Sequence, residues 1–279
     1  MIDIKQALKK AIMLLSSTSP SAQIDAEILL SYVLGTSRTY LYTHPEMKLS
    51  STQQKTYQQC IDKRCQGVPV AYITGSREFW SLPLQISEDT LIPRPETELL
   101  VELALTLSDS PSSLTVLDLG TGCGAIALAL ASERPKWSII GCDLNEASVK
   151  IAKHNADLLR LSNIQFIHSN WFSAFPFQQF DIIVSNPPYI AANDPHLLQG
   201  DVRFEPSRAL ISGKEGLDDL SFLIKHSYDH LRPGGLLLLE HGFNQKDSVT
   251  SMLHQAGYER IQCWQDIFLQ DRVSGGWRK

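Results

Sequence analysis

From Pro95 onward, short apolar runs alternate with segments of helical periodicity, and this alternation constrains the fold more than any other feature. Runs such as Leu114–Leu117 and Asp181–Val184 are apolar on both faces, as covered strands of a parallel sheet must be. Helices are expected over 95–108, 124–134, 146–160, 217–231 and 245–256, and strands over 114–119, 138–142, 164–168, 180–185 and 235–240. Two tail strands, Arg260–Phe268 and Arg272–Trp277, are expected to close the sheet as an antiparallel edge. The pattern predicts an α/β fold with a doubly wound, mostly parallel, seven-stranded sheet.

The N-terminal part has a different period. Apolar residues recur there at helical spacing, and capping sequences bound two expected helices, 19–35 and 50–67. We therefore expect a helical bundle over 1–75, a β-hairpin linker over 76–92 and the α/β domain over 93–279.

The composition of the 279 residues excludes several classes of protein. No apolar run approaches the roughly 20 residues of a membrane span, and the N-terminus lacks a signal sequence, so we expect a cytoplasmic protein without membrane contact. The five cysteines form no Cys-x-x-Cys pair and have no histidines at ligand spacing, so we expect free thiols and no metal site.

The chain has a formal net charge of −5, so it does not have the positive excess that is typical of proteins that bind duplex DNA. Residues 1–80 carry nine Lys and Arg against six Asp and Glu, and the remainder carries 16 against 24, a weak sign of two domains.

A glycine-rich loop, Gly120–Gly124, follows the first strand of the α/β part and opens a helix. Its glycines stand where the backbone must approach a ligand without a Cβ atom in the way. Asp143 ends the next strand, nineteen residues after Gly124, where its carboxylate can accept hydrogen bonds from ribose hydroxyls. The spacing Gly-x-Gly-x-Gly differs from the dinucleotide pattern, and no Gly-Lys-Ser/Thr follows. The loop therefore favours a cofactor with a ribose and no phosphate, such as S-adenosylmethionine.

The second motif is Asn186-Pro187-Pro188-Tyr189, at the carboxyl end of the expected strand 180–185, where a doubly wound sheet binds ligands. The two prolines fix φ and remove two backbone donors, so the loop offers acceptors. The Asn186 side-chain oxygen and the Pro187 carbonyl can each accept one N–H of a planar NH2 group, which biases its nitrogen lone pair toward an electrophilic methyl group. Tyr189 can stack on the flat substrate. The motif predicts a methyltransferase with Asn186, Pro187 and Tyr189 as catalytic residues, working by positioning without a covalent intermediate.

Together with these motifs, four further segments resemble the protein-(glutamine-N5) methyltransferases that modify the Gly-Gly-Gln motif of peptide-chain release factors, the PrmC/HemK family. These segments are Val70–Gly75, Phe79–Trp80, Ile92–Glu98 and Asp201–Pro206, so the resemblance runs nearly end to end. It implies a class I methyltransferase sheet, S-adenosylmethionine as cofactor and a release factor as protein partner. The implied substrate contacts are Asn186, Pro187, Pro188 and Tyr189. The implied cofactor contacts are Gly120, Thr121, Gly122, Cys123, Gly124, Asp143, Trp171 and Asn186.

Two positions depart from the family pattern. Asn170 stands where an Asp often precedes Trp171, and Cys123 stands where Thr or Ser is common. The amide oxygen of Asn170 can still accept a hydrogen bond from the amino group of adenine, more weakly than a carboxylate. We expect neither departure to change the function.

The motifs leave open the roles of four further residues near the expected site. His241, at the end of the strand 235–240, is interpreted as structural. Arg94, Thr97 and Glu98 precede or open a helix, and they either line the pocket or serve as ordinary caps.

Two other functions remain open. A methyltransferase for exocyclic amino groups of DNA or RNA bases would present a similar NH2 to the Asn186 loop, but it needs a basic footprint and a target-reading region. A cofactor-binding scaffold without catalysis would not need an intact Asn186 loop. The acidic α/β part favours a protein substrate, and we expect no direct nucleic-acid substrate. Residues 1–75 are expected to position the release factor, and the chain is expected to be a monomer.

Overall fold

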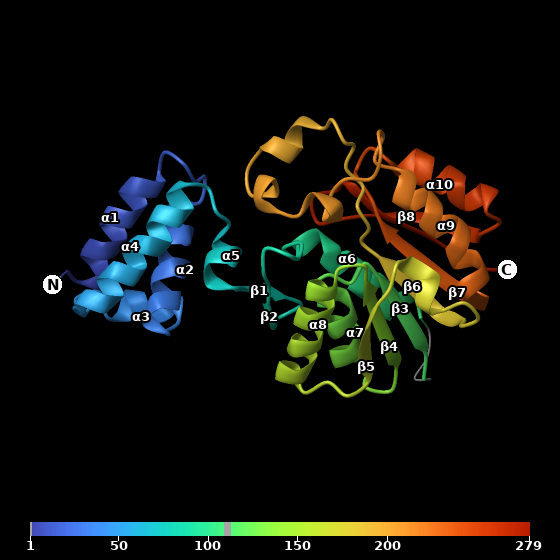
Figure 1. Ribbon diagram of the computed structural model, residues 1–279, viewed down its shortest axis with the longest axis horizontal. Helices are drawn as coiled ribbons and strands as arrows, with labels where there is room; N and C mark the ends of the chain where they lie inside the picture. Colours follow the sequence, from blue (N-terminus) through green and yellow to red (C-terminus); the bar gives the residue numbers. More distant parts are fainter. Residues whose placement is uncertain (1, 109–112) are drawn as a thin grey trace. The chain divides into compact units, whose positions relative to one another are not determined.

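The computed structural model describes residues 2–108 and 113–279 (Figure 1). The chain divides into two compact units. The first extends to Ser76 and includes His196–Phe204, and the second comprises Arg77–Pro195 and Glu205–Lys279. In the described residues, no helix is long and apolar enough to cross a membrane.

The first unit is a helical bundle. Its helices are α1 (Ile4–Leu15), α2 (Ala22–Leu34), α3 (Arg38–Thr43), α4 (Ser51–Cys65) and α5 (Val70–Thr74). Capping boxes begin α1 at Asp3 and α4 at Ser50, and α2 ends at Gly35, whose φ of 64° suits a residue without Cβ. Apolar faces of α1, α2 and α4 form the core, with Leu15 and Leu29 completely buried.

The segment His196–Phe204 packs within this first unit, although the sequence assigns it to 93–279. Its contacts are with the end of α4: the Arg64 Nη1 atom lies 3.0 Å from Asp201 Oδ1, and Arg203 Nη2 donates to the Gln66 carbonyl at 3.2 Å. Arg64 is buried and also pairs with Asp25 at 2.6 Å. Local periodicity carries no information about such ion pairs between distant segments.

The second unit contains a hairpin and a seven-stranded sheet. Strands β1 (Ser76–Phe79) and β2 (Leu82–Gln85) form the hairpin. The sheet has the order β5-β4-β3-β6-β7-β9-β8, in which β9 alone among the described strands runs antiparallel to its neighbours β7 and β8. Its strands are β3 (Thr115–Leu119), β4 (Ser138–Asp143), β5 (Ile164–His168), β6 (Phe180–Ser185), β7 (Leu231–Glu240), β8 (Glu259–Gln265) and β9 (Asp271–Trp277). The predicted doubly wound, mostly parallel sheet of seven strands is confirmed.

Helices cover the sheet in two groups (Figure 1). The helices α6, α7 and α8 contact one another in sequence order, and α9 contacts α10. Their bounds are α6 (Glu98–Leu107), α7 (Ala125–Glu133), α8 (Glu146–Leu159), α9 (Asp218–His230) and α10 (Lys246–Gln255). The 3-10 turns are η1 (Pro95–Thr97), η2 (Trp171–Ala174), η3 (Pro195–Leu198), η4 (Val202–Phe204) and η5 (Ser207–Ala209). The core between these helices and the central strands includes Leu117, Ile183, Leu237 and Leu223, all completely buried.

Three elements of the predicted α/β part differ from the structure by three or four residues at one end. The helix expected over 95–108 begins at Glu98, because its first three residues form the separate 3-10 turn η1. The tail strand expected to reach residue 268 ends at Gln265, because the Asp266 carboxylate accepts the amides of Phe268 and Gln270 and folds the chain into a turn. Strand β7 begins at residue 231 instead of 235, since its first residue already pairs with β6.

Candidate active site

The glycine-rich loop turns back over the end of β4. The amides of Gly120 and Thr121 both donate to the Cys142 carbonyl at 2.9 Å. Gly120, Gly122 and Gly124 have φ values of 72°, 56° and 91°, in the left-handed region that favours glycine. A Cβ atom on Gly124 would lie 2.9 Å from both Leu128 and Phe166, whereas one on Gly122 would meet nothing within 4 Å. The last glycine therefore allows close packing of α7, while Gly122 leaves space for a ligand.

Asp143 ties this loop to the beginning of α8. Its Oδ2 atom accepts the Gly122 amide at 2.9 Å, and its Oδ1 atom accepts the Asn145 amide at 2.7 Å. Each carboxylate oxygen keeps a second lone pair, so Asp143 can still accept hydrogen bonds from a ligand. The predicted ribose acceptor thus also holds the loop in shape.

A second acid, Asp118, lies behind the loop and is completely buried. The Thr121 hydroxyl donates to Asp118 Oδ2 at 2.6 Å. Burial raises the pKa of Asp118 to about 7. Because Thr121 turns toward this acid, its side chain faces the protein interior.

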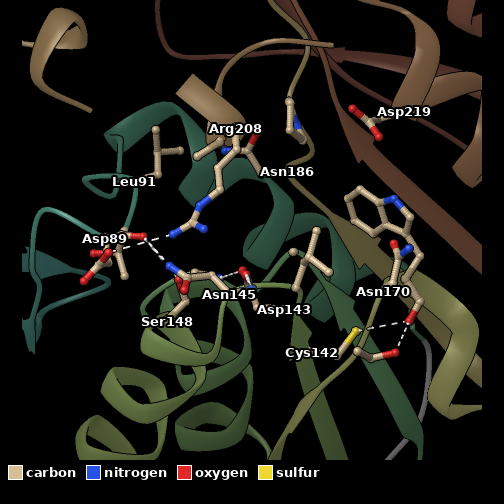
Figure 2. A pocket seen from close by; sticks show the side chains of 18 residues that line it. Asp89, Leu91, Cys142, Asp143, Asn145, Ser148, Asn170, Asn186, Arg208 and Asp219 are labelled. Carbon is tan, nitrogen blue, oxygen red and sulfur yellow. Dashed lines mark hydrogen bonds and ion pairs between the residues drawn. The ribbon is translucent and has the colours of Figure 1, made fainter. Parts of the chain in front are cut away.

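A pocket opens between the glycine-rich loop and the segments that follow β4, β5 and β6 (Figure 2). It holds about 860 Å³ of free space, part of it open to solvent. Its lining consists of 89–91, 142–145, 169–171 and 208–209 together with Gly120, Gly122, Ser148, Asn186, Pro188 and Asp219. Figure 2 shows Asp89, Asn145 and Arg208 at one side of the pocket and Asn170 and Asp219 at the other. The space and its polar rim suit a ligand of nucleoside size.

The Asn186 loop lies beside the glycine-rich loop because β3 and β6 are neighbours. Leu119 and Ser185 are paired in the sheet, and the Ser185 hydroxyl donates to the Leu119 carbonyl at 2.6 Å. Asn186 and Pro188 line the pocket, whereas Pro187 is buried. The fold therefore places both motifs at one edge of the sheet, as the sequence predicts.

Side chains from distant segments hold the Asn186 loop. The Asn186 Nδ2 atom donates to the Thr97 hydroxyl oxygen at 3.1 Å, and the Tyr189 hydroxyl donates to Glu240 Oε1 at 3.1 Å. Glu240 is 1% exposed, and burial raises its pKa to about 7. Burial, together with the neighbouring Glu240, raises the pKa of Tyr189 as well, so its hydroxyl stays protonated.

Comparisons with known proteins agree with this geometry. A family model described as "PrmC N-terminal domain" matches residues 6–75, and one described as "Methyltransferase small domain" matches 95–201. The chain is 50% identical over 273 residues to a curated release factor glutamine methyltransferase from Shewanella oneidensis, covering 98% of this chain and 95% of that protein. A curated release factor glutamine methyltransferase from Escherichia coli is 48% identical over 270 residues, covering 96% of each chain.

The chain belongs to the release factor glutamine methyltransferase family. Solved structures extend the likeness in fold alone. A methyltransferase from Pyrococcus furiosus is 18% identical, with a TM-score of 0.54 over 71% of this chain and 89% of that one. A 16S rRNA methyltransferase from Thermus thermophilus is 22% identical, with a TM-score of 0.52 over 73% of this chain and 50% of that one.

The site residues predicted for this family member fall into two groups. Five of the predicted cofactor contacts line the pocket: Gly120, Gly122, Asp143, Trp171 and Asn186. Three others do not line it: Thr121, Cys123 and Gly124. Cys123 is 2% exposed, and burial raises the pKa of its thiol to about 12. Thr121, Cys123 and Gly124 therefore shape the glycine-rich loop without lining the pocket.

Three residues whose roles the sequence leaves open lie outside the pocket lining. His241 is completely buried, with its Nε2 atom 2.8 Å from the Ser274 hydroxyl, as a structural histidine would be. Arg94 pairs with Glu205 at 2.6 Å, and Glu98 accepts the Trp80 amide at 2.8 Å. None of these three lines the pocket.

Sequence reasoning missed several residues of the site. Asp89 enters the pocket from a loop, Arg208 from the turn η5 and Asp219 from the first turn of α9, where no periodic pattern marks them. Arg208 Nη2 lies 3.8 Å from Asp89 Oδ1 at the rim (Figure 2). Glu240 did carry a signal, since it is a carboxylate directly after four leucines of a buried strand.

Proposed function

We propose that this chain methylates the side-chain amide nitrogen (N5) of the glutamine in the Gly-Gly-Gln motif of a peptide-chain release factor, using S-adenosylmethionine. One observation carries the proposal: the pairing of Leu119 with Ser185, which brings the glycine-rich loop and the Asn186 loop to one pocket. The names of relatives that are 48% and 50% identical supply the substrate class.

The charges of the pocket favour S-adenosylmethionine over a cofactor that carries phosphate. Among the described lining residues, Asp89, Asp143 and Asp219 supply three carboxylates against the guanidinium of Arg208. Such a lining repels a pyrophosphate, whereas it attracts a sulfonium and an ammonium group. Bound S-adenosylmethionine supplies an electrophilic methyl group.

The Asn186 loop then holds the amide nitrogen that accepts this group. The Asn186 Oδ1 atom and the Pro187 carbonyl accept its two N–H groups, so the nitrogen lone pair turns out of the amide plane toward the methyl group. With the cofactor bound, Asn186 and Pro187 would hold this nitrogen while an N–CH3 bond forms, the S–CH3 bond breaks and one N–H proton passes to solvent. Since the Tyr189 hydroxyl is bonded to Glu240, the ring of Tyr189 serves the substrate by stacking.

The remaining parts of the proposal concern the protein partner. We assign the positioning of the release factor to the helical unit 1–75, which is slightly basic where the rest of the chain is acidic. The proposal also includes the hairpin linker 76–92, the methyltransferase domain 93–279, a cytoplasmic location and a monomeric enzyme.

The experiment that tests the proposed function is a transfer assay with radiolabelled S-adenosylmethionine. The acceptors are a purified release factor, the same factor with the Gly-Gly-Gln glutamine changed to alanine, and nucleic acid. We expect label on the unaltered factor alone. Label on nucleic acid alone would overturn the proposal and favour the base methyltransferase. No label on any acceptor, with the cofactor still bound, would favour the scaffold.

A further inference from the structure

The turn between β8 and β9 exposes three consecutive large apolar residues. These are Ile267, Phe268 and Leu269, which are 79%, 62% and 76% exposed, and they are called the apolar turn below. In the described part of the chain, no other three consecutive large apolar residues are exposed. Single exposed apolar residues are common on soluble proteins, whereas a group of them marks a place where another molecule binds.

The apolar turn has a fixed shape. The Asp266 carboxylate accepts the amides of Phe268 at 2.9 Å and Gln270 at 3.1 Å. Leu269 has a φ of 59°, in the left-handed region that a glycine or an asparagine adopts at lower cost. The turn therefore carries a large apolar side chain at a conformational cost that chain reversal alone does not require. A preformed turn of this kind loses little conformational freedom when a partner binds.

The sheet places the apolar turn at the edge that carries the Asn186 loop. Strands β6 and β7 are parallel, so both end at this edge. Strand β9 runs antiparallel to β7 and pairs Val273 with Glu240, so β9 begins where β7 ends. The apolar turn precedes β9 and therefore lies at the same edge. Phe243, which is 60% exposed, follows the end of β7 there as well.

Hydrogen bonds join the Asn186 loop to the segment that carries Phe243. The Gln245 Nε2 atom donates to the Tyr189 carbonyl at 3.0 Å, and the Gln245 Oε1 atom accepts the Gly242 amide at 2.8 Å. Gln245 is itself buried. The backbone on both sides of Phe243 is therefore held against the end of the Asn186 loop.

The guanidinium of Arg272 joins the same segment to the apolar turn. Its Nη1 atom donates to the His241 carbonyl at 3.2 Å, and its Nε atom lies 3.1 Å from Asp266 Oδ2 at the base of the turn. The Asn186 loop, the segment after β7 and the apolar turn thus form one connected surface.

We propose that the apolar turn, together with Phe243, docks an apolar surface of the release factor outside its Gly-Gly-Gln motif. This inference rests on the proposed function, because it takes the release factor as the protein whose glutamine enters the pocket. A protein that reaches the Asn186 loop must cover part of this edge of the sheet. Exposed aromatic and aliphatic side chains next to the loop then become the buried centre of the interface, where most binding energy arises.

The charges beside the apolar turn favour a protein over a nucleic acid as the occupant. Arg272 pairs with Asp266, and Lys246 lies 3.3 Å from Asp271 at the start of β9. The two cations are thus balanced by two carboxylates, whereas binding to phosphates requires a positive excess.

The test uses the full-length enzyme and measures KM for the release factor, kcat and the cofactor Kd. Phe268→Ser removes an exposed ring, and we expect KM to rise roughly tenfold, with kcat at saturating factor changed less than about threefold and the cofactor Kd less than about twofold. Leu269→Asn fits the left-handed backbone, so the turn keeps its shape while it loses an apolar side chain. This variant should raise KM by about threefold or more.

The matched control is Phe177→Ser. Phe177 is 96% exposed and precedes β6, so it lies where this strand begins, at the opposite edge of the sheet. Its removal should leave KM for the release factor unchanged. The inference is overturned if Phe268→Ser and Leu269→Asn keep the wild-type KM, or if Phe177→Ser raises KM equally.

Light scattering on the wild type and on Phe268→Ser tests a different occupant, a second copy of this chain. We expect the mass of one chain for both proteins. A wild-type dimer that Phe268→Ser dissociates would overturn the docking of the release factor at this surface. Wild-type enzyme that labels no release factor would instead defeat the proposed function, so the two failures are distinguishable.

Discussion

The glycine-rich loop and the Asn186 loop follow neighbouring strands of one sheet, yet they are held in different ways. The glycine-rich loop is fixed by its own backbone and near neighbours: Thr121 bonds to Asp118 three positions away, and Gly122 bonds to Asp143 at the end of the next strand. The Asn186 loop is fixed by residues 89 and 51 positions away, Thr97 and Glu240. The cofactor side is thus built locally, and the substrate side depends on the assembled fold.

Each of the two loops contacts one buried acid, but the two acids contact different kinds of structure. Burial raises the pKa of both Asp118 and Glu240 to about 7. Asp118 contacts a loop whose shape is already set by three glycines with positive φ. Glu240 accepts the hydroxyl of Tyr189, a side chain of the Asn186 loop. Changes on the cofactor side should therefore alter affinity, and changes on the substrate side should alter turnover.

The largest effect is expected from Asn186→Ala. Loss of the Oδ1 acceptor should lower kcat by about 10²- to 10³-fold, while the cofactor Kd rises less than about tenfold. Asn170→Ala, which removes another asparagine of the same pocket, is the matched control and should weaken cofactor binding while kcat is largely kept. Undiminished methylation by Asn186→Ala would contradict the role given to its side chain.

The next effect concerns the pH dependence of stability. The folded-state pKa of Glu240 lies near 7 against an ordinary 4.5, so the folded protein holds this proton more tightly between the two values. The free energy of unfolding should fall as the pH rises through this window, by on the order of 1–3 kcal/mol from Glu240. In Glu240→Gln, the part of this pH dependence that comes from Glu240 should disappear, and the similar part that comes from Asp118 should remain. Urea unfolding at pH 4.5 and pH 8 measures both, and an unchanged dependence in Glu240→Gln would refute the assignment.

A smaller effect is expected from Gly120→Ala on the cofactor side. Gly120 has a φ of 72°, and its added Cβ atom would lie 3.4 Å from Trp171 in the pocket. Because this Cβ atom takes up space in the pocket, the cofactor Kd should rise roughly tenfold, whereas the backbone strain of about 1–2 kcal/mol lowers the stability of the fold with and without cofactor. Isothermal titration gives the Kd, and kcat at saturating cofactor should change less than about threefold. A large fall in kcat with an unchanged Kd would contradict the proposal that the glycine-rich loop controls cofactor affinity and the Asn186 loop controls turnover.

The smallest effect is expected from Cys123→Ala. The Cys123 side chain is buried and does not line the pocket, so we expect the cofactor Kd to change less than about twofold. The same titration measures it. A tenfold loss of affinity would mean that the thiol has a direct part in cofactor binding.

The sequence predicts the α/β unit well because its elements follow local periodicity. Strands β5 and β6 have the predicted bounds, 164–168 and 180–185. The two motifs are also predictable, because glycine and proline determine which backbone conformations are allowed at their own positions. Their meeting at one pocket follows from the rule that parallel strands end at one edge.

The residues that hold the Asn186 loop could not be predicted in the same way. Thr97 could be a helix cap as easily as a partner of Asn186, and only the fold brings the two together. The packing of 196–204 with the helical unit depends on ion pairs such as Arg64–Asp201, which leave no periodic trace. Trp171 has a φ of 47°, a backbone conformation that sequence reasoning assigns to glycine.

The central claim is that the Asn186 loop presents a glutamine amide nitrogen for methylation. The most direct measurement is a mass-spectrometric map of the release factor after reaction with the enzyme and S-adenosylmethionine. We predict a single added methyl group on the side-chain nitrogen of the Gly-Gly-Gln glutamine, and far less of it after the same reaction time with Asn186→Ala. A methyl group on any other residue, or an unmodified factor beside methylated nucleic acid, would contradict the claim.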